Sequence, residues 1–199
     1  MSVPFNVFAY AFAIILACDV IVADEHDFYK FSVKDMSGSD VSLEKYRGTV
    51  SLVVNVASYC GFTDSHYNAL VTIQKALGES GKFHVLGFPC NQFGKQEPGS
   101  NKDILDFVKK YNVNFPIFDK IDVVGDNAAP IYTFLAEQTG KAPTWNFWKY
   151  LINPEGRVLK AWPPNYSVDT VFDEIWREVT KAGGNEKSTL GNTGYGGEL

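Results

Sequence analysis

The stretch from Thr49 to Thr63 constrains this chain most, because an apolar run leads directly into a cysteine. Five of the seven residues from Val50 to Val56 are apolar, and four of those five are valine. Such a run predicts a strand buried on both faces, and therefore a parallel-type sheet covered by helices. We expect the strand to end at Ser58. Thr63 and Asp64 are favourable helix N-caps, and the apolar residues after them recur on one helical face.

Cys60 therefore falls in the turn between a strand and a helix. The free N–H groups and the positive dipole end at the start of a helix favour a thiolate over a thiol, and the thiolate is the reactive form. The carboxyl end of a buried strand is also where open α/β sheets bind their ligands. A cysteine taken at random is more often a small buried apolar residue. The position of Cys60 favours a reactive thiol instead.

The rest of the pattern predicts one α/β domain. We expect two short strands around Gly38 and a second buried strand over Phe83–Phe88, which follows the first in a right-handed parallel crossover. Further elements are a helix capped by Ser100 and Asn101 with Ile104, Leu105, Phe107, Val108 and Tyr111 inward, a short strand over Phe115–Phe118, a helix over Ala129–Gln138, an antiparallel hairpin around Asn153–Gly156 and a last helix capped by Ser167. This order indicates a thioredoxin-like fold, with a central mixed sheet flanked by helices and an N-terminal β-hairpin.

Both ends of the chain differ from this domain. Residues 7–18 carry no charge, but a bilayer span needs about 20 apolar residues. The run fits the core of a signal peptide over residues 1–23, cleaved before the acidic Asp24. Because no Lys or Arg precedes the run, a signal-anchor is the alternative. We expect the domain over residues 24–182 and a flexible polar tail over residues 183–199.

Charge and cysteine content exclude two classes of protein. A net charge of -5 and a pI near 5.2 disfavour a nucleic-acid partner, which requires a basic face. Cys18 leaves with a cleaved signal peptide, so Cys60 and Cys90 remain. Two cysteines do not form a disulfide framework for a domain of this size, and we interpret both as working thiols.

A peroxide-reducing thiol needs hydrogen-bond donors around it, because the departing oxygen must gain a proton. Gln92 and Asn146 carry amides, and Trp145 carries an indole N–H; we expect each at the carboxyl end of a neighbouring strand. Taken singly, each has a structural explanation: Trp145 as a core aromatic, and the two amides as loop caps. The order of the sequence does not show whether the three converge on Cys60.

Three blocks of sequence resemble the signatures of the glutathione peroxidase family. They are NVASYCGFT at Asn55–Thr63, FPCNQFGKQEPG at Phe88–Gly99 and WNFWKY at Trp145–Tyr150. The resemblance extends from about Phe28 to Val179. With its apolar N-terminal segment, the chain is most similar to the cysteine-type endoplasmic reticulum branch of the family, glutathione peroxidases seven and eight.

The resemblance implies a thioredoxin-like enzyme that reduces hydrogen peroxide or organic hydroperoxides. Cys60 would be the peroxidatic residue, with Gln92, Trp145 and Asn146 as its activating residues, and would pass through a sulfenic acid. No bound cofactor is implied, and the reductant is a thiol co-substrate. The donor is expected to be a protein dithiol such as protein disulfide isomerase. The alternatives are glutathione or thioredoxin with lipid hydroperoxides, or a peroxide sensor with little turnover.

Cys90 is the candidate resolving residue, and a structural thiol is its alternative role. The motif at Cys60 is Cys-Gly-Phe-Thr, so a dithiol exchange within one turn is excluded. No cysteine occurs between Asn101 and Thr144, where thioredoxin-dependent members carry their resolving residue. The three histidines have no ligand spacing with the cysteines, so we expect no metal.

Location and assembly are predicted from the two ends of the chain, a glycosylation sequon and one short segment. A signal peptide indicates the secretory pathway, either the endoplasmic reticulum lumen or secretion, with no stable membrane span once it is cleaved. The chain ends Gly-Gly-Glu-Leu, which shares only part of a retention tetrapeptide. Asn165 lies in a glycosylation sequon. The short segment between Pro130 and Trp145 leaves little room for the loop of tetrameric members, and favours a monomer.

Overall fold

The computed structural model describes residues 27–183. The signal peptide or signal-anchor expected over residues 1–23 lies outside the described residues. So does the tail expected over 183–199, apart from residue 183.

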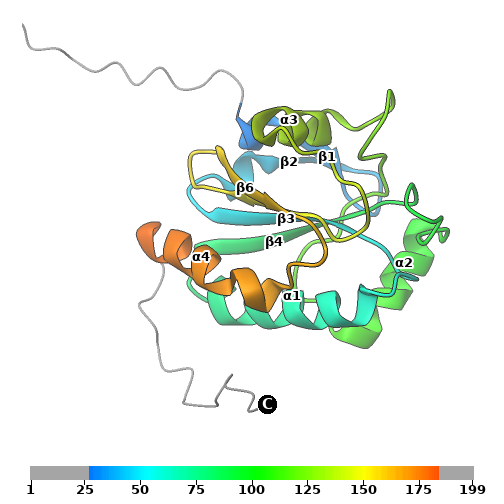
Figure 1. The fold of residues 1–199 in the computed structure, drawn as a ribbon, viewed down its shortest axis with the longest axis horizontal. Helices are drawn as coiled ribbons and strands as arrows, with labels where there is room; N and C mark the ends of the chain where they lie inside the picture. The colour runs from blue at the N-terminus through cyan, green and yellow to red at the C-terminus, as the bar shows by residue number, and fades with distance from the viewer. Residues whose placement is uncertain (1–26, 184–199) are drawn as a thin grey trace, which may run out of the picture.

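The centre of the molecule is a mixed sheet of four strands, as predicted. Its order is β4-β3-β5-β6, with β3 at Val50–Val56, β4 at Phe83–Pro89, β5 at Lys149–Ile152 and β6 at Val158–Trp162. β3 and β4 are parallel, while β5 is antiparallel to both β3 and β6. The carboxyl ends of β3 and β4 therefore lie at the same end of the sheet, near α2 at the right of Figure 1.

The apolar run of β3 is explained by helices on both faces of the sheet. All seven residues of β3 are buried. Leu52, Val54 and Val56 pack into a cluster with α1 (Thr63–Gly78) and α4 (Val168–Lys181), which we call the lower cluster. Val53 points the other way, into the cluster beneath α3 (Pro130–Thr139), which we call the upper cluster. Figure 1 shows α1 and α4 on one side of the sheet and α3 on the other.

The predicted N-terminal hairpin is present as a separate two-stranded sheet. β1 (Ser32–Lys34) pairs antiparallel with β2 (Asp40–Ser42), on the α3 side of the molecule. Short 3-10 helices precede and follow it, η1 at Phe28–Lys30 and η2 at Leu43–Tyr46. The buried aromatic rings of η1 close the upper cluster.

The helix expected after Ser100 forms as α2 (Asn101–Val108), continued by the 3-10 turn η3 (Lys109–Tyr111). Ser100 and Asp103 form a capping box at its start. Ile104 and Val108 are buried, but Leu105 is 40% exposed, so its predicted inward position was wrong. α2 lies at the end of the sheet, and its core side is formed by the buried Ile104 and Val108 together with the partly buried Phe107.

The segment Phe115–Phe118 does not form the expected strand and makes only isolated bridges. Ile117 pairs with Gly87 of β4, and Phe118 with Asp35. Gly87 permits this close approach, because a Cβ there would lie 2.7 Å from Cδ1 of Ile117. The last helix begins after Ser167, whose side chain accepts a hydrogen bond from the Thr170 backbone, as predicted. None of the helices within residues 27–183 combines the length and the apolar character that a bilayer crossing requires.

Candidate active site

Cys60 lies in the turn between β3 and α1, as the sequence predicted, and its side chain is half-buried with a free thiol. Thr63 shapes this turn: its hydroxyl donates to the Ala57 carbonyl at 2.8 Å and accepts from the Cys60 N–H at 3.0 Å. The expectation that Thr63 is the N-cap was wrong, since it is the first residue of α1. The N-cap is Phe62, which has no side-chain hydrogen bond to the helix. The positive end of α1 is thus uncapped by any side chain beside Cys60.

Asn55, inside β3, fixes the segment that carries Trp145 and Asn146. Its side-chain amide donates to the Trp145 carbonyl at 3.0 Å and accepts from the Trp148 N–H at 2.9 Å. Its backbone carbonyl accepts from the Phe147 N–H at 2.7 Å. Phe147 has a φ of 66°, uncommon for a residue with a side chain, and these bonds hold it there. The segment before β5 is therefore held at the carboxyl end of β3.

Three segments far apart in the sequence meet at this end of the sheet. The Tyr59 N–H donates to the Gln96 carbonyl at 3.0 Å, which joins the Cys60 turn to the loop after β4. The Asn146 side-chain N donates to Oε1 of Gln96 at 2.9 Å, which joins that loop to the segment before β5. The ring of Trp145 lies 6.2 Å from that of Phe93. Trp145 and Asn146 thus share one site with the Cys60 turn.

Two hydrogen-bond donors of this site are unoccupied. Asn146 is fully buried, and its side-chain nitrogen donates to the side-chain oxygen Oε1 of Gln96. Among the described residues, none accepts a hydrogen bond from the amide nitrogen of Gln96 or from the indole nitrogen of Trp145. Trp145 is 38% exposed, so its N–H can meet a molecule from solution. These are donors of the kind that stabilise a developing oxyanion.

Gln92 is not brought into this group, contrary to the expectation from sequence. Its amide nitrogen donates to the Val124 carbonyl at 2.8 Å, and its Oε1 accepts from the N–H groups of Val123 and Val124. The Cys90 sulfur lies 3.6 Å from the same oxygen. Gln92 therefore fixes the loop at Val123. Gln96 was not predicted from the sequence, although it is a second glutamine in the same block, four positions after Gln92.

Cys90 differs from Cys60 in its environment. It is fully buried in the upper cluster near Phe88, and burial raises the pKa of its thiol. Cys60 packs against the lower cluster, on the opposite face of the sheet. Both thiols are free. A direct Cys60–Cys90 disulfide would thus require one of the two loops to open.

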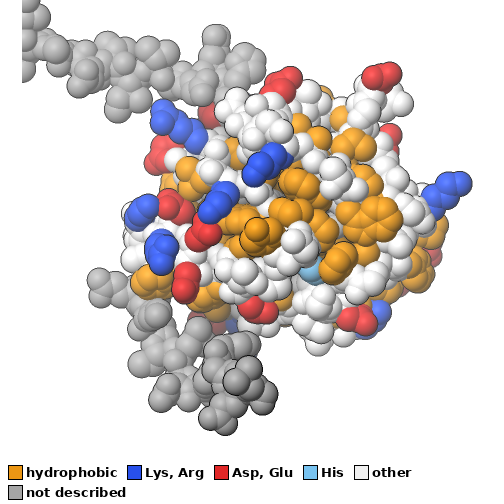
Figure 2. All heavy atoms as spheres, viewed as in Figure 1, with side chains coloured by type: hydrophobic (Ala, Val, Ile, Leu, Met, Phe, Trp, Pro, Cys, Tyr) orange, Lys and Arg blue, Asp and Glu red, His pale blue; other side chains and the backbone are white. Residues whose placement is uncertain are grey.

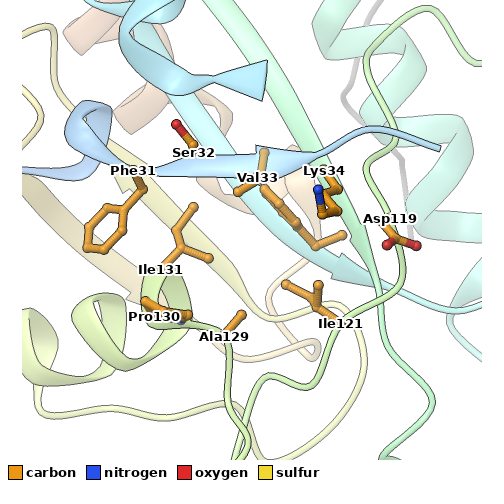
Figure 3. Close-up of a pocket in the computed structure, with 10 residues that line it drawn as sticks. Phe31, Ser32, Val33, Lys34, Asp119, Ile121, Ala129, Pro130 and Ile131 are labelled. Atoms are coloured by element: carbon orange, nitrogen blue, oxygen red, sulfur yellow. The ribbon is translucent and has the colours of Figure 1, made fainter. Parts of the chain in front are cut away.

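The surface around Cys60 is largely aromatic. Tyr59 is 66% exposed, and Phe62 and Trp145 are exposed to 37% and 38%. In Figure 2 hydrophobic side chains gather over the centre and right of the face viewed, whereas most charged ones lie to the left. A separate pocket of about 260 Å³ lies on the α3 side, between β1 and the start of α3, lined by Phe31, Val33 and Ile131 (Figure 3). Cys60 does not line that pocket.

Comparison with known proteins identifies the family of this chain. The family model described as "Glutathione peroxidase" matches residues 28–136, more than half of the chain. This chain belongs to the glutathione peroxidase family. It is 56% identical to glutathione peroxidase 7 of Homo sapiens over 158 residues, which cover 79% of this chain and 84% of that protein. It is 50% identical over 151 residues to the Homo sapiens protein named probable glutathione peroxidase 8, covering 75% and 72%.

A solved member of the family confirms the fold. The crystal structure of Trgpx in apo form superposes with a TM-score of 0.66 at 35% identity, covering 78% of this chain and 97% of that one. The predicted thioredoxin-like fold is therefore confirmed. As a glutathione peroxidase, the protein is an oxidoreductase that uses a thiol to reduce a hydroperoxide. Within residues 27–183, no group of three or more His, Cys, Asp and Glu could hold a metal ion.

Proposed function

We propose that Cys60 is the peroxidatic residue of this peroxidase. Its thiolate attacks one oxygen of the hydroperoxide, the O–O bond breaks, and the departing alkoxide or hydroxide takes up a proton. The products are a Cys60 sulfenic acid and an alcohol or water. The position of Cys60 supports the role, because its free thiol is only half-buried, in the turn that leads into α1.

The observation that carries this proposal is the pair of unoccupied donors on Gln96 and Trp145. Both belong to segments bonded to each other at the Cys60 turn. A departing oxygen that develops negative charge there would meet two N–H donors that need not first break another bond. In this proposal Asn146 positions the side chain of Gln96 through their hydrogen bond. Gln92 has no part in this proposal, since its amide is already engaged by Val123 and Val124.

We further propose that the electron donor is a protein dithiol, such as a protein disulfide isomerase. One donor thiol attacks the Cys60 sulfenic sulfur and releases water, and the second thiol then displaces Cys60 as a thiolate, which leaves the donor oxidised by two electrons. The exposed Tyr59, Phe62 and Trp145 support a protein partner, because aromatic residues are enriched at protein interfaces. Cys90 stays a candidate resolving residue, through opening of its loop.

The donor is tested by following peroxide consumption with reduced protein disulfide isomerase, glutathione and thioredoxin at equal thiol concentration. We expect the disulfide isomerase to support the fastest turnover. Faster turnover with glutathione or thioredoxin would reassign the donor. Rapid Cys60 oxidation without turnover by any of the three would indicate a peroxide sensor.

The location and the assembly state are also proposals. We propose that the protein enters the secretory pathway, to the endoplasmic reticulum lumen or beyond, and acts as a monomer. Asn165 is exposed in the turn before α4, where an oligosaccharide can attach. In secretory cells, wild type should lose apparent mass on glycosidase treatment, and Asn165→Gln should not. Light scattering of the purified protein should give the mass of one chain.

A further inference from the structure

Lys149, the first residue of β5, is a buried cation that the proposed chemistry does not use. Its side chain is fully buried, whereas lysine is almost never buried unless it is paired. Within residues 27–183 it forms no ion pair with a carboxylate. Its Nζ instead donates to the Phe147 carbonyl at 2.8 Å and lies 3.2 Å from Nε2 of His66. An unusual group is thus held beneath the Trp145–Phe147 segment.

The partners of His66 dictate its tautomer. Its Nδ1 lies 3.0 Å from the Phe62 carbonyl, which can only accept, so Nδ1 carries the hydrogen. In the neutral imidazole Nε2 is then the acceptor, and the Lys149 Nζ donates to it. Burial, with the nearby Lys149 charge, lowers the pKa of His66 to about 4, so this neutral form holds at physiological pH. The ring also packs between those of Phe62 and Phe147.

Together these bonds form a continuous strut across the site. It runs from the Phe147 carbonyl through Lys149 and His66 to the Phe62 carbonyl. One end adjoins Asn146, and the other end is two residues from Cys60. We propose that Lys149 and His66 are positioning residues that hold the donor segment at the proper distance from the Cys60 sulfur. This inference rests on the proposed function of Cys60.

The strut needs hydrogen bonds and does not need charge. Burial lowers the pKa of Lys149 to about 7, so the amine is largely neutral above that pH. A neutral amine still has two N–H groups, enough for both the Phe147 carbonyl and His66. The groups facing the pair are the carbonyls of Phe62, Phe147 and Pro164, the Ser65 hydroxyl and two aromatic rings, none of which carries a charge. We therefore assign the strut a geometric role.

The experiment compares two reactions of Cys60 in Lys149→Met and wild type. Oxidation by hydrogen peroxide requires the donors, while alkylation by iodoacetamide requires only an accessible thiolate. We expect Lys149→Met to lower the second-order rate constant for oxidation about tenfold, since small misplacements of catalytic groups are costly. Alkylation should stay near the wild-type rate. Equal oxidation rates, or a parallel loss in both reactions, would overturn the positioning role.

Leu151→Ala is the matched control. Leu151 lies on β5 two residues from Lys149, on the same face and buried in the lower cluster. This change weakens the same strand and leaves the strut intact, so the oxidation rate of the folded protein should not change. If Leu151→Ala slowed oxidation as much as Lys149→Met, general destabilisation would explain both, and the proposal would fail.

A second pair of variants covers the case in which Lys149→Met does not fold. His66→Leu removes both bonds of the ring, while His66→Gln offers an amide that can donate and accept in their place. We expect slow oxidation in His66→Leu and faster oxidation in His66→Gln; the reverse order would contradict the strut. Wild-type Cys60 inert to peroxide would instead refute the proposed function itself.

Discussion

Cys60 and Cys90 follow neighbouring parallel strands, yet their surroundings differ in almost every respect. The Cys90 N–H donates to the carbonyl of Val56, the last residue of β3, so the two loops begin side by side. Cys60 emerges half-buried at the uncapped start of a helix. Cys90 is sealed among aromatic rings, with a raised thiol pKa. The carboxyl end of a strand is therefore not enough to make a thiol reactive.

The chain path after each strand decides the difference. After β3, Thr63 closes a tight turn that carries Cys60 outward to α1. After β4, Cys90 is the first residue beyond the strand and keeps the strand's orientation into the upper cluster. Donors accompany only the first of these thiols, because Gln96 and Trp145 are bonded around its turn, whereas Gln92 is occupied beside Cys90.

Among changes at the two cysteine regions, replacing Cys60 should have the largest effect. Cys60→Ser removes the attacking sulfur, and peroxide reduction should fall by more than about a thousandfold. The measurement is peroxide consumption with a saturating thiol donor. Activity retained by Cys60→Ser would show that another group carries the chemistry, with Cys90 the first to examine.

The two glutamines provide a sharper test of which thiol has the donors. Gln96→Leu should slow Cys60 oxidation by about ten- to a hundredfold, because one oxyanion donor is lost. Gln92→Leu should leave that rate nearly unchanged and lower the free energy of unfolding by about 1 kcal/mol, through its bonds to Val123 and Val124. Stopped-flow oxidation and urea unfolding measure the two effects. A slower rate in Gln92→Leu than in Gln96→Leu would return Gln92 to the active site.

Glu97, next to Gln96 in the loop after β4, makes stability depend on pH. Its carboxyl is fully buried, and burial raises its pKa to about 7, with Ser58 and Lys120 opposing the shift. Between pH 4.5 and 7 the folded state holds this proton and the unfolded state does not. Stability from Glu97 is therefore present at low pH and is lost as pH rises through 7.

Glu97→Gln should remove that dependence. The quantity to compare is the free energy of unfolding of the variant minus that of wild type. We expect this difference to be about 2 kcal/mol larger at pH 8 than at pH 4.5. Urea unfolding at both pH values measures it. A difference between variant and wild type that is equal at the two values would mean that folding does not raise the pKa of Glu97.

Replacing Cys90 should have the smallest effect on the first step. Cys90 packs on the opposite face of the sheet from Cys60. In Cys90→Ala the rate of Cys60 oxidation should therefore stay within about twofold of wild type. Stopped-flow fluorescence can follow this rate, because Trp145 lies in the same site. A large loss of rate would show that the two thiols act as one unit.

Local patterns in the sequence were sufficient to predict the helices and strands. They were insufficient to predict which partners the side chains of the site contact. The apolar run of β3 and the helical periodicity of α4 report burial directly, so the sheet and its helices could be predicted. The choice between Gln92 and Gln96 depends on which loop each amide meets, and those partners lie some 30 to 50 positions away in the sequence. The role of Thr63 likewise depends on Ala57, across the turn.

The most direct test is to expose the reduced protein to one equivalent of hydrogen peroxide, quench it rapidly with a sulfenic acid reagent and map the adduct by mass spectrometry. We predict that the first adduct lies on Cys60 while Cys90 is still an unmodified thiol. A first adduct on Cys90, or none on Cys60 while peroxide is consumed, would contradict it.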